Sequence, residues 1–243
     1  MPTSKTHQDR IVLVTGASRG IGRATALAFA EAGAHVIGLA RTQGGLEELD
    51  DEVKAVGGRA TLIPADLTDE ASMDRLPAVL AERFGRLDAL VLNAGMLGDL
   101  TPVQDIQPAV WNQAMSINVT ANVRLLHGLD PLLRTSPSGR LVGISSGRAR
   151  KFVAFWGIYS ATKAAFEAVL RTYAEENDQS SIKVNIVDPG PIRTDMRAKA
   201  MPGEDPLTIP APAALTPLIL QLTEPNEQRH GEIVSFKDWA ESR

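Results

Sequence analysis

The chain has 243 residues, of which 44% are hydrophobic and 22% charged, and its formal net charge at pH 7 is −4. These proportions are ordinary for a globular protein, and the mixed charges argue against nucleic acid as a partner. The chain has no cysteine, which excludes disulfides, thiol catalysis and cysteine-ligated metal.

The N-terminal segment and the histidines allow further exclusions. Residues 1–10 are polar and lack the apolar core of a signal peptide, and no apolar run approaches the roughly 18 residues of a membrane span. We therefore expect a cytoplasmic protein with no membrane partner. His7, His35, His127 and His230 show no metal-ligand spacing, so we expect them to have surface or capping roles and expect no bound metal.

Short β-branched runs alternate with longer helical stretches from residue 11 nearly to the end. The pattern predicts strands at 11–14, 35–40, 60–64, 89–92, 140–145, 183–187 and 232–236. It predicts helices at 24–32, 46–56, 70–84, 108–133, 157–177 and 213–222. Such alternation is typical of an α/β fold, with a parallel sheet covered by helices on both faces. No linker interrupts it, so we expect one domain over 1–243; the proline-dense stretch 202–217 is typical of a loop leading into a short helix.

A glycine-rich turn, Thr15-Gly16-Ala17-Ser18-Arg19-Gly20-Ile21-Gly22, joins the first strand to an alanine-rich helix. The glycines allow a tight turn and close approach of the backbone, and the helix N-terminus offers free N–H groups to a pyrophosphate. Glycines alone also suit a plain strand-to-helix turn, but their position between strand and helix favours nucleotide binding.

The second predicted strand ends in Arg41, where a NAD site would have a carboxylate. Arg41 and Arg19 together can clamp a 2′-phosphate, because guanidinium groups bind phosphate well. They can also be two solvated arginines. We predict NADP(H) in preference to NAD(H).

Tyr159 and Lys163 are four residues apart, and Ser146 lies thirteen positions before Tyr159. If 157–176 is a helix, the phenol and the ammonium lie side by side on one face. A nearby cation favours the phenolate, so we expect the pKa of Tyr159 to fall below its usual value of ~10. Such a tyrosine can exchange a proton with a carbonyl or alcohol oxygen, although the same pair is common on solvated helix faces.

Taken together, these motifs resemble the short-chain dehydrogenase/reductase family over about residues 9–237. The glycine turn is similar to the family's TGxxxGxG, Asn93-Ala94-Gly95 to its NAG, and Ser146, Tyr159 and Lys163 to its S-x12-Y-x3-K signature. The resemblance, in particular to 3-oxoacyl-carrier-protein reductases, implies a Rossmann-type doubly wound parallel sheet. About seven strands in the order 3-2-1-4-5-6-7 are implied, with helices on both faces.

The resemblance also implies roles for individual residues. Tyr159 is the general acid, Ser146 polarises the substrate carbonyl, Lys163 holds the nicotinamide ribose, and Asn118 holds a water that links Lys163 to solvent. The implied cofactor-binding residues are Gly16, Ser18, Arg19, Gly20, Ile21, Gly22, Arg41, Asp66, Leu67, Asn93, Ala94, Gly95, Tyr159, Lys163, Pro189, Gly190, Ile192 and Thr194.

Several of these residues also have a purely structural interpretation. Asp66 can cap the following helix, and Asn118 can bend its helix while satisfied by backbone groups. Turn or strand-end roles are open for Asn93, Gly95, Ser146, Pro189 and Gly190.

The substrate is less defined. Arg148, Arg150 and Lys151 either contact an anionic substrate or form a solvated loop face, and Phe152, Phe155 and Trp156 either wall an apolar pocket or belong to the core or a subunit interface. The resemblance implies a homodimer or homotetramer. The family's Asp-Gly-Gly turn is absent after 231–236, which leaves the tetramer open.

The leading hypothesis is an NADP(H)-dependent reductase of a small-molecule ketone or aldehyde, with 3-oxoacyl thioesters as one candidate class. A non-catalytic NADP(H)-binding sensor or interaction protein on the same fold is the main alternative. A sugar-nucleotide epimerase or dehydratase of the related longer family needs a large C-terminal domain, whereas about fifty residues follow Gly190 here.

Overall fold

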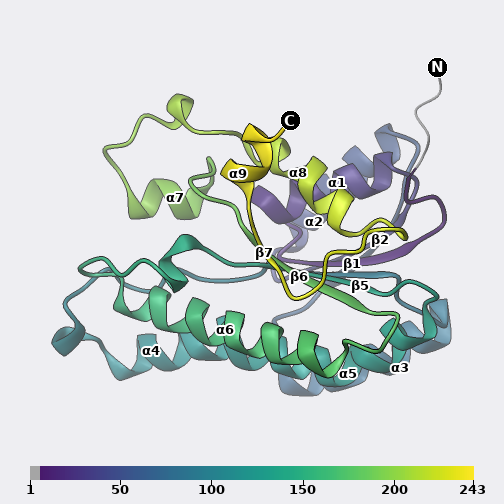
Figure 1. The fold of residues 1–243 in the computed structure, drawn as a ribbon, viewed down its shortest axis with the longest axis horizontal. Helices are drawn as coiled ribbons and strands as arrows, with labels where there is room; N and C mark the ends of the chain where they lie inside the picture. Colours follow the sequence, from purple (N-terminus) through teal and green to yellow (C-terminus); the bar gives the residue numbers. More distant parts are fainter. Residues whose placement is uncertain (1–5) are drawn as a thin grey trace.

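A seven-stranded parallel sheet forms the centre of the computed structural model, which describes residues 6–243 (Figure 1). The strand order is β3-β2-β1-β4-β5-β6-β7, and every neighbouring pair is parallel, which confirms the predicted topology. The strands are β1 (Ile11–Thr15), β2 (His35–Ala40), β3 (Arg59–Pro64), β4 (Ala89–Leu92), β5 (Arg140–Ile144), β6 (Lys183–Asp188) and β7 (Ile233–Ser235).

Helices cover both faces of the sheet. Figure 1 shows α1, α2, α8 and α9 above it and α3, α4, α5 and α6 below it, with α7 in the segment that projects beside the upper layer. Their bounds are α1 (Gly20–Glu31), α2 (Gln43–Ala55), α3 (Glu70–Phe84), α4 (Pro108–Met115), α5 (Ala121–Thr135), α6 (Gly157–Glu176), α7 (Asp195–Ala200), α8 (Thr216–Leu222) and α9 (Phe236–Glu241).

Alternate residues of the strands supply two apolar cores, one on each face. In β1, Leu13 packs into the cluster shared with α3, α5 and α6, whereas Val12 and Val14 pack into the cluster shared with α1, α2 and α8. Successive side chains of a strand point to opposite faces, so a strand covered on both faces must be apolar throughout. The continuous apolar runs of the sequence have this physical cause.

Three local features depart from the predicted elements. The predicted helix 108–133 is interrupted by a π-helical turn, η2 (Ser116–Thr120), between α4 and α5. The short helices α7 and α9 were not predicted. Both begin with a hydroxyl cap, because Thr194 accepts a hydrogen bond from the Arg197 N–H and Ser235 from the Asp238 N–H.

His7 contradicts the expected surface or capping role. Its side chain is completely buried, its ring packs edge-on against Phe29, and its Nε2 lies 2.9 Å from the Thr223 hydroxyl. Burial, with the nearby charge of Arg10, lowers the pKa of His7 to about 4. The ring therefore packs as a neutral core side chain.

Within residues 6–243, no helix combines the length and apolar character needed to cross a bilayer.

Candidate active site

A cleft of about 1160 Å³ opens at the carboxyl ends of the central strands, where β1 and β4 lie side by side and the strand order reverses. This is the place where open α/β sheets bind ligands. Eighteen of the predicted site residues line it: Gly16, Ser18, Arg19, Gly20, Ile21, Arg41, Asp66, Leu67, Asn93, Ala94, Gly95, Ser146, Tyr159, Lys163, Pro189, Gly190, Ile192 and Thr194. Gly22 and Asn118 do not line the cleft; they lie behind residues that do.

The glycine turn needs its glycines for backbone reasons. Gly16 and Gly20 have φ of +67° and +56°, a region that favours glycine. A Cβ on Gly22 would lie 2.2 Å from the Gly16 carbonyl oxygen, so the turn closes only with glycine at that position. Gly22 thus shapes the turn from inside.

The N-terminus of α1 is suited to an anion. No side chain caps it and its first turn has no acidic residue, so its N–H groups and the positive end of the helix dipole carry no internal anion. Gly20 and Ile21 of this turn line the cleft. A nucleotide pyrophosphate fits this combination.

Asn93 fastens the end of β4 to the end of β1. Its side-chain Nδ2 donates to the Thr15 carbonyl at 2.9 Å, and the Thr15 hydroxyl accepts from the backbone N–H groups of Asn93 and Ala94, both at 3.0 Å. Thr15, which the sequence analysis did not single out, therefore fixes the floor of the cleft. Its position directly before Gly16 was the available signal.

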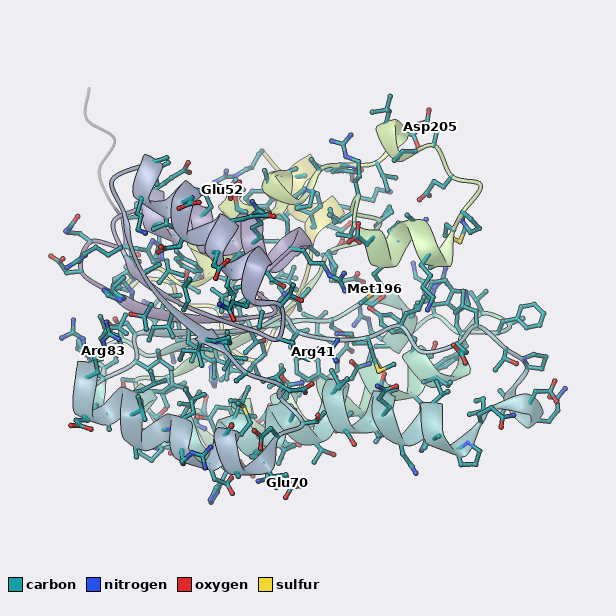
Figure 2. The ribbon with its side chains drawn as sticks, turned by 180° about the vertical axis from the view of Figure 1, so that it is seen from behind. Arg41, Glu52, Glu70, Arg83, Met196 and Asp205 are labelled. Atoms are coloured by element: carbon teal, nitrogen blue, oxygen red, sulfur yellow. The ribbon has the colours of Figure 1, made fainter. Side chains whose placement is uncertain are left out.

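The two arginines predicted at the adenosine end both face carboxylates. Arg41 Nη1 lies 3.5 Å from an Asp66 oxygen, and Arg19 Nη1 lies 3.5 Å from an Asp195 oxygen. Figure 2, a view from behind, shows Arg41 between the two helical layers. Both arginine side chains are more than half exposed, so they remain open to a ligand.

Asp66 does not cap α3, because Asp69 does so by accepting from the Ser72 N–H. The Asp66 carboxylate instead accepts from the Thr68 N–H at 2.8 Å and from its hydroxyl at 2.7 Å. Burial raises the pKa of Asp66, but the hydrogen bonds from Thr68 and the charge of Arg41 outweigh it, and the pKa lies below its ordinary value. The helix-cap interpretation of Asp66 is therefore wrong.

Tyr159 is 9% exposed and packs edge-on against Trp156, in an apolar cluster with Leu97. Burial raises the pKa of Tyr159 to about 12; a hydrogen bond with the Ser146 side chain opposes this shift and the charge of Asp188 adds to it. The expectation of a lowered pKa is therefore wrong. Desolvation of the phenolate is the largest cause of the shift.

Lys163 lies beside Tyr159, with Nζ 5.8 Å from the centre of the phenol ring. The ammonium donates to the Ile144 carbonyl at 2.8 Å. Burial lowers the pKa of Lys163 to about 8, which the charge of Glu167 partly offsets. The predicted juxtaposition of Tyr159 and Lys163 is thus present.

Asn118 sits in the π-helical turn and braces the loop after β4 against α6. Its Oδ1 accepts from the Met96 N–H at 2.8 Å, and its Nδ2 donates to the Met96 carbonyl and to the Thr162 hydroxyl, both at 2.9 Å. A Cβ on Gly95 would lie 3.2 Å from this Oδ1 and 3.6 Å from Lys163 Nζ, so the amide and the ammonium flank the same glycine.

The residues considered for substrate contact in the sequence have distinct surroundings. The Arg148 guanidinium stacks on Trp156, 4.7 Å from the ring centre, and Lys151 lines the cleft. Trp156 lines the cleft too, whereas Phe152 and Phe155 are 80% and 55% exposed, outside the core. Figure 2 shows Met196 of α7 between the two helical layers and Asp205 at the outer end of the same segment.

Three charged residues near the site form contacts that the sequence did not predict. Arg150 contacts Glu167 and Asp188. Glu167 follows Lys163 by four residues, and Asp188 directly precedes Pro189-Gly190, so both positions carried a signal. Among the described residues, no group of three or more His, Cys, Asp or Glu side chains is placed to hold a metal ion.

Known proteins have similar sequences and the same fold. The sequence model of the short chain dehydrogenase family matches residues 10–205. YciK of Escherichia coli, an uncharacterised oxidoreductase, is 38% identical over 231 residues, which are 94% of this chain and 91% of YciK. A 3-oxoacyl-[acyl-carrier-protein] reductase of Synechocystis is 34% identical over 188 residues, 77% of this chain and 76% of that protein.

A short chain dehydrogenase of Shigella flexneri, solved in complex with NADP, superposes with a TM-score of 0.93 at 37% identity, covering 97% of this chain and 100% of that one. The match thus extends over sequence and fold. The chain belongs to the short-chain dehydrogenase/reductase family of oxidoreductases.

Proposed function

We propose that this protein is an NADP(H)-dependent oxidoreductase that reduces a ketone or aldehyde to an alcohol, with Tyr159 as the general acid. One domain carries both the cofactor and the substrate sites. The observation that carries the proposal is a buried phenol beside Lys163, with Ser146 and an uncapped glycine-rich helix N-terminus lining the same cleft.

The cofactor residues divide by the part of the nucleotide that they suit. The first turn of α1 would hold the pyrophosphate, Arg41 and Arg19 the 2′-phosphate, and Asp66 the adenine. Lys163 would hold the nicotinamide ribose, and the segment 189–194 would close over the nicotinamide amide. The bound NADP of the Shigella flexneri relative supports this choice of cofactor.

When bound, the nicotinamide supplies a hydride to the carbonyl carbon. Tyr159 gives its proton to the carbonyl oxygen, and Ser146 donates a hydrogen bond that polarises the same oxygen. With a pKa of about 12, Tyr159 keeps its proton at neutral pH, which is the form that a general acid needs. General acid catalysis contributes typically ~10²–10⁴-fold to the rate.

The experiment is NADPH and NADH oxidation against a panel of carbonyl compounds: an acetoacetyl thioester, diketones, aromatic aldehydes and quinones. We expect turnover with NADPH that Tyr159→Phe abolishes while NADPH binding stays nearly unchanged, because the ring remains and only the proton donor is lost. Tyr173→Phe, on the same helix and distant from the cleft lining, is the matched control. Substantial turnover by Tyr159→Phe would remove Tyr159 from its role.

A non-catalytic NADP(H)-binding role is the second candidate. It would be favoured by tight NADPH binding without turnover of any carbonyl in the panel. The presence of Asn118, Ser146, Tyr159 and Lys163 together favours the enzyme. The proposed enzyme acts in the cytoplasm as a homodimer or homotetramer, and size-exclusion chromatography with light scattering distinguishes the two.

A further inference from the structure

One guanidinium links the three segments that carry the proposed chemistry. Ser146 lies at the start of a 3₁₀ turn, η3 (Gly147–Ala149), between Ser145 and Arg150. The Ser145 hydroxyl donates to Glu167 Oε1 at 2.5 Å, and Arg150 Nη1 donates to the same oxygen. Both ends of the turn are therefore fastened to one carboxylate.

The same guanidinium reaches the end of β6. Arg150 Nη2 donates to Asp188 Oδ2 at 2.6 Å, and the other oxygen of Asp188 accepts from the Gly190 N–H at 3.2 Å. Glu167 lies one helical turn after Lys163 on α6, and Asp188 lines the cleft. Arg150 thus joins the turn of Ser146, the helix of Tyr159 and Lys163, and the segment proposed to close over the nicotinamide.

The burial of the two carboxylates makes their partner important. The Glu167 side chain is 8% exposed and that of Asp188 17%, against 38% for Arg150. Removing one partner of a buried ion pair leaves an uncompensated charge in a poorly solvated place, which destabilises the fold around it. Partial exposure of Arg150 reduces that destabilisation, because solvent screens the guanidinium.

We infer that Arg150 is a positioning residue for the proposed reaction: it holds the turn of Ser146 against α6 and β6, and it neutralises two carboxylates, Asp188 near Tyr159 and Glu167 near Lys163. The inference rests on the proposed function. It assigns Arg150 to the support of the catalytic group and not to contact with an anionic substrate.

The charges that face Tyr159 come from three directions. Lys163 lies beside it on α6, Asp188 approaches from β6, and Arg148 of the η3 turn reaches it through Trp156. Leu97 and Met196 contribute only apolar surface to this cluster. Asp188 favours the protonated phenol, so loss of the Arg150 charge strengthens that effect and loss of the Asp188 charge removes it.

The test compares Arg150→Gln, Arg150→Lys and Asp188→Asn, with alcohol oxidation measured as a function of pH. Oxidation needs the phenolate, so its rate rises through the pKa of Tyr159. We expect Arg150→Gln to lower kcat about 10–100-fold through misplacement of Ser146, with a smaller change in the KM for NADP. Arg150→Lys should recover part of kcat, because lysine keeps the positive charge. The recovery should be incomplete, because lysine lacks the guanidinium that bridges Glu167 and Asp188.

The pH profile separates this role from a merely structural one. Arg150→Gln should move the rising limb about half to one pH unit upwards, and Asp188→Asn should move it downwards by a similar amount. Asparagine keeps an oxygen for the Gly190 N–H, so the turn there stays closed. The matched control is Arg124→Gln, since Arg124 also bridges two carboxylates, Glu70 and Asp74, away from the cleft.

A second readout does not depend on turnover. The chain has two tyrosines, so Tyr173→Phe leaves Tyr159 as the sole phenol, and its ultraviolet phenolate absorbance can be titrated directly. The same opposite shifts are expected there, with circular dichroism showing that the fold persists over the range. If no carbonyl or alcohol is turned over, the proposed function fails while this titration still tests Arg150. The inference would be overturned by wild-type kcat in both Arg150 variants. It would also be overturned if Arg150→Gln and Asp188→Asn shifted the pH profile in the same direction.

Discussion

Single side chains set the charge at the end of the cleft lined by Arg41 and Arg19. Arg41 pairs with the half-buried Asp66 and Arg19 with the exposed Asp195, each at 3.5 Å, and both arginines are largely exposed. Such pairs contribute about 0–1 kcal/mol. A phosphate dianion offers more charge and a geometry that matches the guanidinium fork, so it can displace these carboxylates at little cost.

Arg41→Ala is therefore expected to weaken the use of NADPH and leave NADH almost unchanged. Hydrogen bonds to charged groups contribute about 1.5–3 kcal/mol, which corresponds to a rise of roughly 10–100-fold in the KM for NADPH. The measurement is steady-state kinetics with both cofactors. Arg83→Ala, on α3 and far from Arg41 in Figure 2, is the control. An equal rise for both cofactors would contradict a role in 2′-phosphate binding.

At the level of elements, the π-helical turn between α4 and α5 places one amide where three elements meet. The additional residue of such a turn displaces the helix locally, and π-turns are frequent at functional sites. Here the middle residue of the turn is Asn118, 1% exposed and hydrogen-bonded to both backbone groups of Met96 and to Thr162 on α6. The turn thereby couples the loop after β4 to the helix that carries Tyr159 and Lys163.

Asn118→Ala should lower both stability and turnover. It leaves the Met96 N–H and C=O without their partner. Each unsatisfied group costs about 1–3 kcal/mol when buried, so the pair would cost about 2–6 kcal/mol, and we expect the lower part of this range because both groups are only partly buried. Urea denaturation measures the stability, and kcat at saturating NADPH measures the effect on Lys163. Asn112→Ala, exposed on α4, should change neither. Unchanged stability in Asn118→Ala would mean that the loop after β4 holds its position alone.

Sequence patterns predict the helices and strands better than they predict the contacts between them. The positions of β1 to β6 can be predicted from their apolar runs, because a strand buried on both faces must be apolar. The glycine turn can be predicted as well, because positive φ favours glycine. The π-turn at Asn118 follows from contacts with Met96 and Thr162, which no local pattern encodes. The raised pKa of Tyr159 likewise follows from its burial in the cluster with Trp156 and Leu97, which the spacing of Tyr159 and Lys163 does not reveal.

At the scale of the whole molecule, a polar layer at the amino ends of the strands stabilises the sheet on the side opposite the cleft. His7 reaches Thr223 across 216 positions of sequence, and Arg10 donates to the Asp88 carbonyl at 2.8 Å. Asp88 in turn accepts from the Ser136 hydroxyl at 2.6 Å. These contacts join the segment before β1 to the residue before β4 and to the connections after α5 and α8, so segments far apart in the sequence support one sheet.

This layer makes the fold sensitive to acid through His7. The pKa of His7 is about 4 in the folded protein and 6.5 in the unfolded chain, so between these values the unfolded chain binds a proton that the folded protein does not. The free energy of unfolding therefore falls as pH falls from 6.5 towards 4, by about 3 kcal/mol in all, since one pKa unit corresponds to ~1.4 kcal/mol. His7→Gln removes the titration and can keep a hydrogen bond to Thr223, so the difference in free energy of unfolding between wild type and this variant should decline over that range. Urea denaturation at several pH values measures it, with exposed His127→Gln as the control, and a difference that stays constant from pH 6.5 to 4 would show that His7 does not set the acid limit.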